Sequence, residues 1–445
     1  MRDFLPAEKA IRERALGVIR SSFAAQGFDE IETPVMEDAA RLHSGLGGDN
    51  EKLAFAVMKR GLGPADATAA AESGDLLSLA DLGLRFDLTV PLARFYATHR
   101  ANLPTVFRAI QIAPVWRAER PQKGRFRQFM QCDIDIIGEP SALAEIELIT
   151  ATVAALDALG LTGTSVRIND RRILTALLRY WAVPAEQSER ALITLDKLDK
   201  IGVDGVVAEL ATLGIDTSGV GETLRSIADA GWNLLDGDAD VRDSDADLRD
   251  GDAEALDGEG DALDGDADAR DGYASAPAWL DQDTYRELLA LRAALPGVAL
   301  VFDPTLVRGM GYYTGTIFEI AHPDLPYSLG GGGRYDGMIG RFLGTEVPAC
   351  GFSIGFERIV ELLAAESAAD ENAIVLIHEK DADPAGLLAL KGELVASGKR
   401  VRLERRAKNL KPVLERAAEA RFSSFAFVGA ETTDAASLEI KPLAP

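Results

Sequence analysis

Apolar and polar residues follow two different spacings along this chain, and each spacing predicts a kind of element. Over residues 6–26 apolar positions recur every three or four residues, which predicts a helix that ends at Gly27. Residues 28–33 form a strand-like run. Between residues 84 and 138, short runs rich in Phe, Val and Ile alternate with charge, as in RFDLTV, VFRAIQIAPVWRA and RQFMQCDIDII. These runs predict antiparallel strands.

A long helical stretch interrupts the strand pattern. Residues 173–296 are mostly helical in pattern, and strand patterns return from residue 298 onward. We therefore expect an α+β domain, an antiparallel sheet flanked by helices, in two parts, 1–172 and 297–368, with a helical domain inserted at 173–296. Residues 372–445 alternate strand with helix, which predicts a C-terminal α/β domain.

Composition places the chain among globular proteins. Its 445 residues predict about three domains, and 47% hydrophobic with 27% charged residues excludes wholly disordered, collagen-like and disulfide-stapled classes. Cys132 and Cys350 are too few for a disulfide framework or a four-cysteine metal site, which favours a reducing cytoplasm. No apolar run approaches the roughly 18 residues of a membrane span, and the amino terminus lacks the pattern of a signal peptide. We therefore expect a cytoplasmic protein without a membrane segment.

The net charge of −24 is concentrated in one tract. Residues 236–272 hold fourteen Asp and two Glu against three Arg, and residues 390–421 hold ten Lys or Arg against four Glu. The tract begins like a calcium loop, but Val241 and Asp247 stand where such a loop needs Gly and Glu, so we expect disorder instead. The basic C-terminal segment keeps RNA binding open.

Chemistry concentrates in residues 107–138. Five cations crowd a predicted hairpin loop, and the returning strand carries Gln131, Asp133 and Asp135 at alternate positions. Alternation with period two places these three side chains on one face. Such a face is costly to bury unless it lines a polar pocket.

Six segments, in this order, resemble the motifs of class II aminoacyl-tRNA synthetases, specifically the bacterial histidyl-tRNA synthetases. They are GFDEIETPVMED around Pro34 (motif 1), LRFDLTVP (84–91), the RPQKGR loop within 107–138 (motif 2), LVRGMGYYTGTIFE (306–319), GGGGRYDGMI (330–339) and GFSIGFERI (351–359, motif 3). The resemblance implies a class II synthetase fold and a C-terminal domain of the anticodon-binding type. It also implies a homodimer, because motif 1 builds the subunit interface in this class.

The resemblance implies a ligase that activates L-histidine with ATP and Mg²⁺ and then transfers histidine to the 3′-terminal adenosine of tRNA(His). Arg117 would hold the α-phosphate and the carboxylate, and Arg125 and Arg358 would hold the distal phosphates, with Glu119 in the same ATP site. Arg308 would stabilise the charge of the transition state. From spacing alone, a structural salt bridge is an equally good interpretation of Arg308.

By the same resemblance, a set of polar and aromatic residues would bind histidine. Asp87, Thr89 and Gln131 would receive its α-amino group, Asp135 and Tyr313 would bracket its imidazole with Tyr312 and Tyr335 nearby, and Arg117 and Arg308 would complete the site. Core packing is the alternative for the tyrosines. Because Tyr312 and Tyr313 are neighbours in a predicted strand, we expect them to face opposite ways.

Contacts to tRNA are implied for Arg120 and Gln122 in the motif 2 loop and for Arg405 and Lys408 in the C-terminal domain; a solvated charged face is the alternative. The chain departs from the family at Gly311, where an Asp is usual. It also ends soon after LEIKPL, so we expect the last helix of the anticodon domain to be absent.

Two rival functions remain open. One is a synthetase-like regulatory subunit of ATP phosphoribosyltransferase in histidine biosynthesis, and the other is a histidine sensor without transfer activity. Such regulatory paralogues generally lack the anticodon domain and lose catalytic arginines. The presence of Arg117, Arg125, Arg308 and Arg358 with a C-terminal domain favours the ligase.

Overall fold

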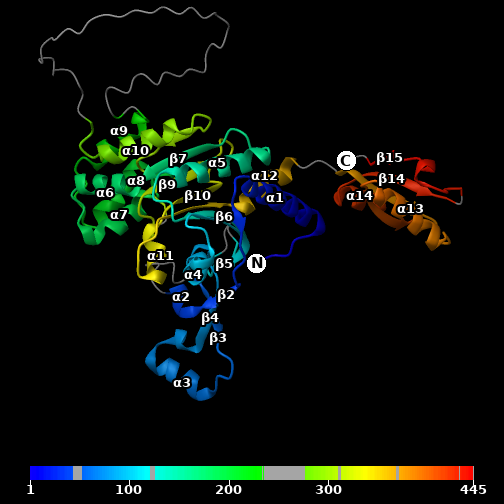
Figure 1. Ribbon diagram of the computed structural model, residues 1–445, viewed down its shortest axis with the longest axis horizontal. Helices are drawn as coiled ribbons and strands as arrows, with labels where there is room; N and C mark the ends of the chain where they lie inside the picture. Colours follow the sequence, from blue (N-terminus) through cyan, green and yellow to red (C-terminus); the bar gives the residue numbers. More distant parts are fainter. Residues whose placement is uncertain are drawn as a thin grey trace, which may run out of the picture. The chain divides into compact units, whose positions relative to one another are not determined.

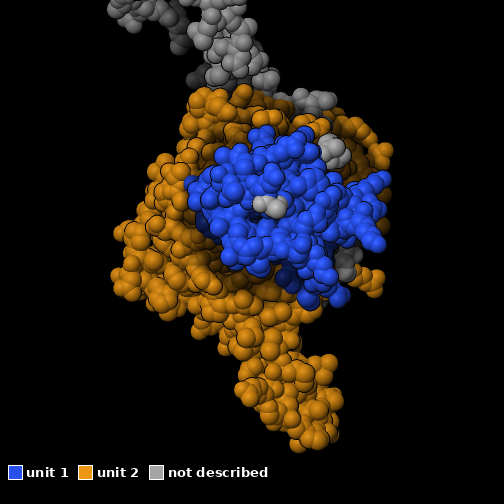
Figure 2. All heavy atoms as spheres, turned by 90° about the vertical axis from the view of Figure 1, so that its right-hand side faces the viewer, with its two compact units in different colours: residues 1–21, 121–129, 356–445 blue, residues 22–120, 130–355 orange. Residues whose placement is uncertain are grey.

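The computed structural model (Figure 1) describes residues 1–43, 53–120, 126–232, 234, 276–308, 312–366, 370–429 and 431–443. The acidic tract 236–272, Gln122, Arg125 and Gly311 lie outside the described residues. Contacts divide the chain into two compact units, a smaller one of residues 1–21, 121–129 and 356–445 and a larger one of residues 22–120 and 130–355 (Figure 2). The domain boundaries expected from the sequence remain predictions.

The larger unit is built on an eight-stranded sheet of order β1-β5-β6-β11-β10-β9-β7-β8 (Figure 1). Its strands are β1 (Asp29–Glu30), β5 (Phe107–Trp116), β6 (Gln128–Ile137), β11 (Ala349–Ile354), β10 (Gly330–Arg334), β9 (Thr316–Ala321), β7 (Ser165–Asp170) and β8 (Leu300–Phe302). Neighbours from β6 to β7 pair antiparallel, and parallel pairs lie at both edges. The predicted α+β class with an antiparallel sheet is confirmed.

Helices pack on this sheet, and a further group of helices follows β7 in the chain. The helix α5 (Leu143–Ala158) packs on β11, and α11 (Asp336–Leu343) packs on β11 and on α4 (Thr89–His99). The predicted helical stretch after β7 is also observed, as α6 (Arg171–Tyr180), α7 (Ser188–Leu195), α8 (Leu198–Thr212), α9 (Val220–Ala230) and α10 (Gln282–Ala293). Short 3₁₀ turns occupy Leu76–Leu79, Arg100–Asn102, Ala185–Gln187 and Ala435–Ser437.

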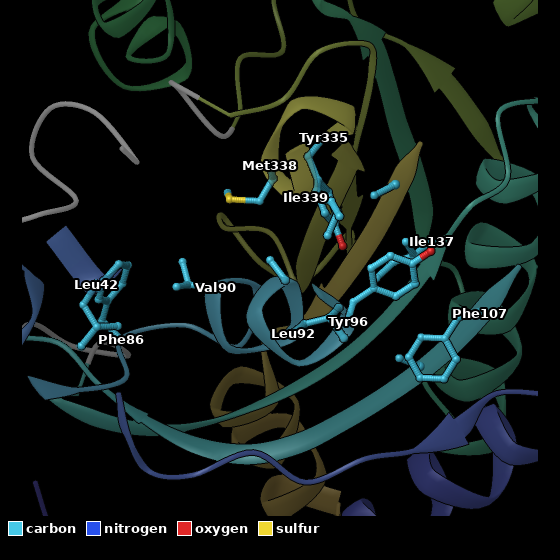
Figure 3. Packing of buried hydrophobic residues seen from close by; sticks show 13 residues of the cluster. Leu42, Phe86, Val90, Leu92, Tyr96, Phe107, Ile137, Tyr335, Met338 and Ile339 are labelled. Carbon is cyan, nitrogen blue, oxygen red and sulfur yellow. The ribbon is translucent and has the colours of Figure 1, made fainter. Parts of the chain in front are cut away.

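A buried apolar cluster joins α4 and α11 to the sheet (Figure 3). It contains Phe86, Val90, Leu92 and Tyr96 from α4 and the loop before it, Phe107 and Ile137 from the sheet, and Tyr335, Met338 and Ile339 at α11. The side chains lie between the helices and the strands. This cluster therefore holds α11, and with it Tyr335, against β6, the strand that carries Asp133 and Asp135.

A second, three-stranded sheet of order β2-β4-β3 belongs to the same unit. It consists of β2 (Met36–Asp38), β4 (Ala80–Leu84) and β3 (Phe55–Met58), with α2 (Ala39–His43) and α3 (Pro64–Ser73) beside it. Gly83 favours the close packing of α2, because a Cβ there would lie 2.8 Å from Cδ1 of Leu42 and 3.1 Å from the Phe55 carbonyl oxygen.

The prediction that RFDLTV is a strand is wrong. The strand β4 ends at Leu84, and Arg85 turns inward to donate hydrogen bonds to the carbonyl oxygens of Thr33 at 2.8 Å and Pro114 at 2.9 Å. The chain then enters α4, where the backbone N–H of Val90 donates to the carboxylate of Asp87 at 3.2 Å. Pro91 is tolerated because first-turn N–H groups have no partner within the helix.

The smaller unit contains the C-terminal α/β domain. Its sheet has the order β13-β12-β14-β15, parallel except for β15. The elements are β12 (Asp370–His378), α13 (Pro384–Ala396), β13 (Arg400–Arg405), α14 (Lys411–Glu419), β14 (Phe422–Val428) and β15 (Lys441–Pro442). Separate apolar clusters pack α13 and α14 on the sheet. The predicted alternation of strand and helix is confirmed.

The smaller unit also contains most of α1 (Pro6–Ala25) and all of α12 (Phe356–Glu366). Arg12 and Glu357 link these helices by a buried ion pair, with Nη2 donating to Oε1 at 2.8 Å. Within the described ranges, no helix combines the length and the apolar character that crossing a bilayer requires.

Candidate active site

The strand β6 brings its alternating polar residues to one buried face, as the sequence predicted. Gln131, Asp133 and Asp135 are 8%, 4% and 4% exposed, and β11 places Ser353 opposite Asp133 and Gly351 opposite Asp135. A Cβ at Gly351 would lie 1.9 Å from Oδ1 of Asp135. Only glycine therefore leaves room for this carboxylate.

Asp135 is held by Tyr335 from the start of α11. The Tyr335 hydroxyl donates to Oδ1 of Asp135 at 2.6 Å, and its ring is buried in the apolar cluster (Figure 3). Burial raises the pKa of Asp135 to about 7, although the hydrogen bond from Tyr335 acts to lower it. The pair can thus present a carboxyl group that changes charge near neutral pH.

Tyr312 and Tyr313 do not face opposite ways, so that prediction is wrong. Their hydroxyl oxygens are 3.2 Å apart, and their ring centroids are 4.4 Å apart. The strand β9 begins only at Thr316, so both tyrosines precede it and the alternation of a strand does not apply. Both rings pack against the apolar cluster that contains Tyr335.

A third carboxylate lies near this face. Burial raises the pKa of Asp87 to about 6, against the lowering effects of the Val90 N–H and of Arg117. Arg117 is anchored by donating from Nε to the Phe86 carbonyl oxygen at 3.0 Å. Asp87, Asp133 and Arg117 all act on the pKa of Tyr312, which burial raises to about 12. Thr89 is the first residue of α4, two residues beyond Asp87.

Asp133 has the most perturbed surroundings of the three carboxylates. Burial, followed by the charge of Asp135, raises its pKa well above the usual range, while a hydrogen bond with Ser353 lowers it. Asp87 adds to the increase and Arg117 opposes it. A site this rich in buried carboxyl groups favours a ligand that carries positive charge and N–H donors.

Arg308 is fixed by residues that the sequence interpretation did not include. Its Nε donates to Oε2 of Glu319 at 2.6 Å, and its Nη2 donates to the Ser328 hydroxyl at 2.8 Å. The guanidinium lies over Gly331, where a Cβ would be 2.4 Å from Cζ. The salt bridge named as an alternative is therefore present, and it holds the cation over β10, a strand of the sheet that also contains Asp135.

Arg334 was also missed. Its Nε and Nη2 donate to the two carboxylate oxygens of the buried Glu145 at 2.7 and 2.6 Å, which ties β10 to α5 immediately before Tyr335. The signal in the sequence was the position of Arg334, a charged residue directly after the glycine run of the strand β10.

The remaining predicted site residues are placed as follows. Half-buried Glu119 and exposed Arg120 follow β5, Arg358 lies on α12, Arg405 ends β13, and Lys408 is exposed in the loop after it. Arg358, Arg405 and Lys408 belong to the smaller unit. Gln122 and Arg125 are outside the described residues.

Comparison with known proteins identifies the family of the chain. A family model described as histidyl-tRNA synthetase matches residues 1–359. The chain belongs to the histidyl-tRNA synthetase family. It is 60% identical over 448 residues to a histidine--tRNA ligase of Leifsonia xyli subsp. xyli, covering 100% of this chain and 97% of that protein. It is 40% identical to a probable histidine--tRNA ligase of Tropheryma whipplei, covering 100% and 98%.

Solved structures of the family share the fold. A histidyl-tRNA synthetase from Nostoc sp. PCC 7120 aligns with a TM-score of 0.69 at 23% identity, covering 99% of this chain and 93% of that one. An ATP phosphoribosyltransferase regulatory subunit/histidyl-tRNA synthetase from Bacillus halodurans aligns with a TM-score of 0.66 at 21% identity, covering 96% of both chains. At these identities the likeness concerns the fold alone.

Proposed function

We propose that this chain activates L-histidine with ATP to form histidyl-adenylate and transfers histidine to the 3′-terminal adenosine of tRNA(His). One observation carries the proposal: Asp135, bound by Tyr335 on a buried face, with Asp87 and Arg117 nearby. An imidazole N–H can donate to Asp135, and an α-ammonium group can bind at Asp87, Thr89 and Gln131. A side chain that lacks ring nitrogens would leave buried polar groups unpaired, which is a strong basis for discrimination.

In the activation step, a carboxylate oxygen of histidine attacks the α-phosphorus of ATP, and the bond to the bridging oxygen of pyrophosphate breaks. Both reactants are anionic, so fixed cations must lower their repulsion. Arg117 is assigned to the histidine carboxylate and the α-phosphate. Arg308 is assigned to the transition state, and Glu319 and Ser328 hold its guanidinium in place before the reactants arrive.

ATP would be held by Arg117, Glu119, Arg125 and Arg358. Among the described residues no group of three or more His, Cys, Asp or Glu side chains is arranged to hold a metal ion. Mg²⁺ would arrive with ATP and would neutralise part of the phosphate charge. The arginines perform the positioning.

In the transfer step, the terminal ribose hydroxyl of tRNA attacks the acyl carbon of the adenylate, and AMP leaves. Arg120 and Gln122 are assigned to the acceptor end, and Arg405 and Lys408 to the anticodon arm. Arg405 and Lys408 are exposed where parallel strands of the C-terminal sheet end. Exposed cations there can neutralise RNA phosphates.

Because tRNA is charged in the cytoplasm, and both cysteines are free thiols, we also propose a cytoplasmic location.

The regulatory and sensor alternatives are less well supported. The 60% identical relative, named as a histidine--tRNA ligase, aligns with the whole chain, including the C-terminal domain. The Bacillus halodurans structure is only 21% identical and informs the fold alone.

We further propose a homodimer that buries one face of the three-stranded sheet. Strand register places Met36, Leu84 and Phe55 in one row and Leu82 in the next row of the same face. Met36 is 47% exposed and Leu82 is 36% exposed. Exposed Asp38 lies beside Leu82 on this face. An exposed face that carries several apolar side chains is typical of a protein interface, and two-fold pairing is the commonest solution for a single chain.

Sedimentation at micromolar concentration tests the dimer. Leu82→Lys should shift the protein toward monomer, because a charge cannot be buried unpaired in an apolar interface. Leu388→Lys is the matched control, since Leu388 is 62% exposed on α13 in the other unit. A monomeric wild-type protein would contradict the proposal.

The activity is tested by histidine-dependent exchange between ATP and labelled pyrophosphate, followed by charging of a tRNA(His) transcript. We expect exchange with histidine and not with the other standard amino acids. Arg308→Ala should lower exchange by about 10² to 10⁴ while the protein stays folded. Histidine binding without exchange would support the sensor, and exchange without charging would refute the transfer step.

A further inference from the structure

The side-chain amide of Gln131 is held in an unusual way. Its Nε2 donates to Oδ2 of Asp133 at 3.2 Å and to the Ser353 hydroxyl at 3.2 Å. Its Oε1 is buried and has no hydrogen-bond partner among the described residues. Buried polar atoms are rarely left unpaired, because each lost hydrogen bond is costly. Other buried side-chain atoms among the described residues also have no partner, but Oε1 of Gln131 lies on the polar face of β6 with Asp133 and Asp135, where a ligand can supply the N–H donor.

The orientation of this amide follows from the chemistry of its neighbour. An ionised carboxylate can only accept hydrogen bonds, so the NH₂ group of Gln131 must face Asp133. A protonated Asp133 can also accept this bond through its carbonyl oxygen, but its hydroxyl could equally donate to Oε1 of Gln131, so it is the ionised form that enforces this orientation. Since NH₂ and oxygen lie on opposite sides of an amide, Oε1 must then point away from Asp133.

Asp133 itself is buried and is held from the neighbouring strand β11. It faces Ser353 across the pairing of β6 with β11, and it is 4% exposed. Asp135, Asp87 and Arg117 are the charged groups that act on it. A residue held this firmly can impose a single orientation on the Gln131 amide.

We propose that Asp133 is a positioning residue that orients Gln131, so that Oε1 of Gln131 accepts a hydrogen bond from the α-ammonium group of histidine. This inference rests on the proposed function. Asp133 acts through Gln131 and makes no contact with the substrate. Without Asp133, the amide could rotate and present NH₂ donors to a cationic group, which would oppose binding.

A double-mutant cycle separates this role from direct binding. Asp133→Ala should raise the KM for histidine in pyrophosphate exchange by about tenfold or more and leave the KM for ATP unchanged. In the Gln131→Ala background the same substitution should have little further effect, because the group that it positions is gone. Asp133→Asn, which keeps the shape and a carbonyl acceptor, should recover part of the affinity.

The control cycle pairs Asp133→Ala with Gln111→Ala. Gln111 is also buried, and its Oε1 likewise has no partner among the described residues, but its Nε2 donates to the Leu88 carbonyl oxygen at 3.0 Å and not to Asp133. The two effects on the KM for histidine should therefore add. If Asp133→Ala does not fold, a cycle of Asp133→Leu with Gln131→Ala gives the same comparison, because Leu is close to Asp in shape and has no acceptor.

Additive effects of Asp133 and Gln131 would overturn the inference, because Asp133 would then act on the substrate directly. A wild-type KM in Asp133→Ala would also overturn it. Absence of histidine-dependent exchange in the wild-type protein would instead refute the proposed function, so the two failures are distinguishable.

Discussion

Tyr335→Phe removes one hydroxyl group and tests how the pocket holds an imidazole ring. The hydroxyl donates to Asp135 at 2.6 Å, and the rest of the ring packs in the apolar cluster. The substitution therefore keeps the packing and removes the hydrogen bond. Because that hydrogen bond lowers the pKa of Asp135, its loss should raise a pKa that is now about 7.

The size of the effect follows from the strength of one hydrogen bond to a charged group. About 2 kcal/mol corresponds to about 1.5 pKa units, which would move Asp135 to about 8.5. At pH 7.5 the ionised fraction would fall from about three quarters to about one tenth. If histidine binds the ionised form, its KM should rise about eightfold at pH 7.5 and only about twofold at pH 8.5.

Pyrophosphate exchange measured as a function of histidine concentration between pH 6.5 and 8.5 gives these KM values. Tyr96→Phe is the matched control, since Tyr96 is buried in the same apolar cluster (Figure 3) and should show no such pH dependence. An increase in the KM for histidine that is the same at every pH would mean that Tyr335 acts by packing. An unchanged KM would refute the assignment of Asp135 to the imidazole ring.

Four further predictions follow from the same structure. The pKa of Asp135 is higher in the folded state than in the unfolded state, so its contribution to the free energy of unfolding is present at low pH and is lost as pH rises to about 7. Between pH 5 and 8, the free energy of unfolding of Asp135→Asn should therefore increase by about 2 to 3 kcal/mol relative to that of the wild type, as measured by urea unfolding with tryptophan fluorescence. Gly331→Ala should displace the guanidinium of Arg308 and lower the exchange rate by about 10² or more, whereas Gly337→Ala, with open space around it, should not. Reversing the charges of Arg405 and Lys408 should weaken tRNA charging and leave pyrophosphate exchange unchanged. The slope of the logarithm of the tRNA binding constant against the logarithm of salt concentration should become shallower by about 0.7 to 0.9 per lost phosphate contact. An unaltered slope would mean that Arg405 and Lys408 do not contact RNA. Deleting residues 236–272 should leave melting temperature and exchange nearly unchanged, since the tract has little apolar surface to bury, and a large loss of either would contradict this.

Local pattern predicted the regular elements well. The helix predicted over residues 6–26 is observed as Pro6–Ala25, and the predicted strands around residues 107–137 are observed as Phe107–Trp116 and Gln128–Ile137. Periodicity also placed Gln131, Asp133 and Asp135 on one face, because a strand imposes period two whatever its partners are. The pattern failed at RFDLTV, where the long-range hydrogen bonds of Arg85 replaced the strand by a turn into a helix.

The sequence by itself determined the class of fold, the family and the kinds of residue in the site, since these depend on spacing and on motifs that are local in the chain. Only the tertiary structure decided how those residues meet. Tyr312 and Tyr313 share one cluster, Glu319 anchors Arg308, and Tyr335 reaches Asp135 across 200 positions of sequence. Such contacts depend on which strands become neighbours and in what register, and no local spacing encodes that. The charge state of Asp135 has the same origin, because its pKa is raised by burial that the whole sheet creates.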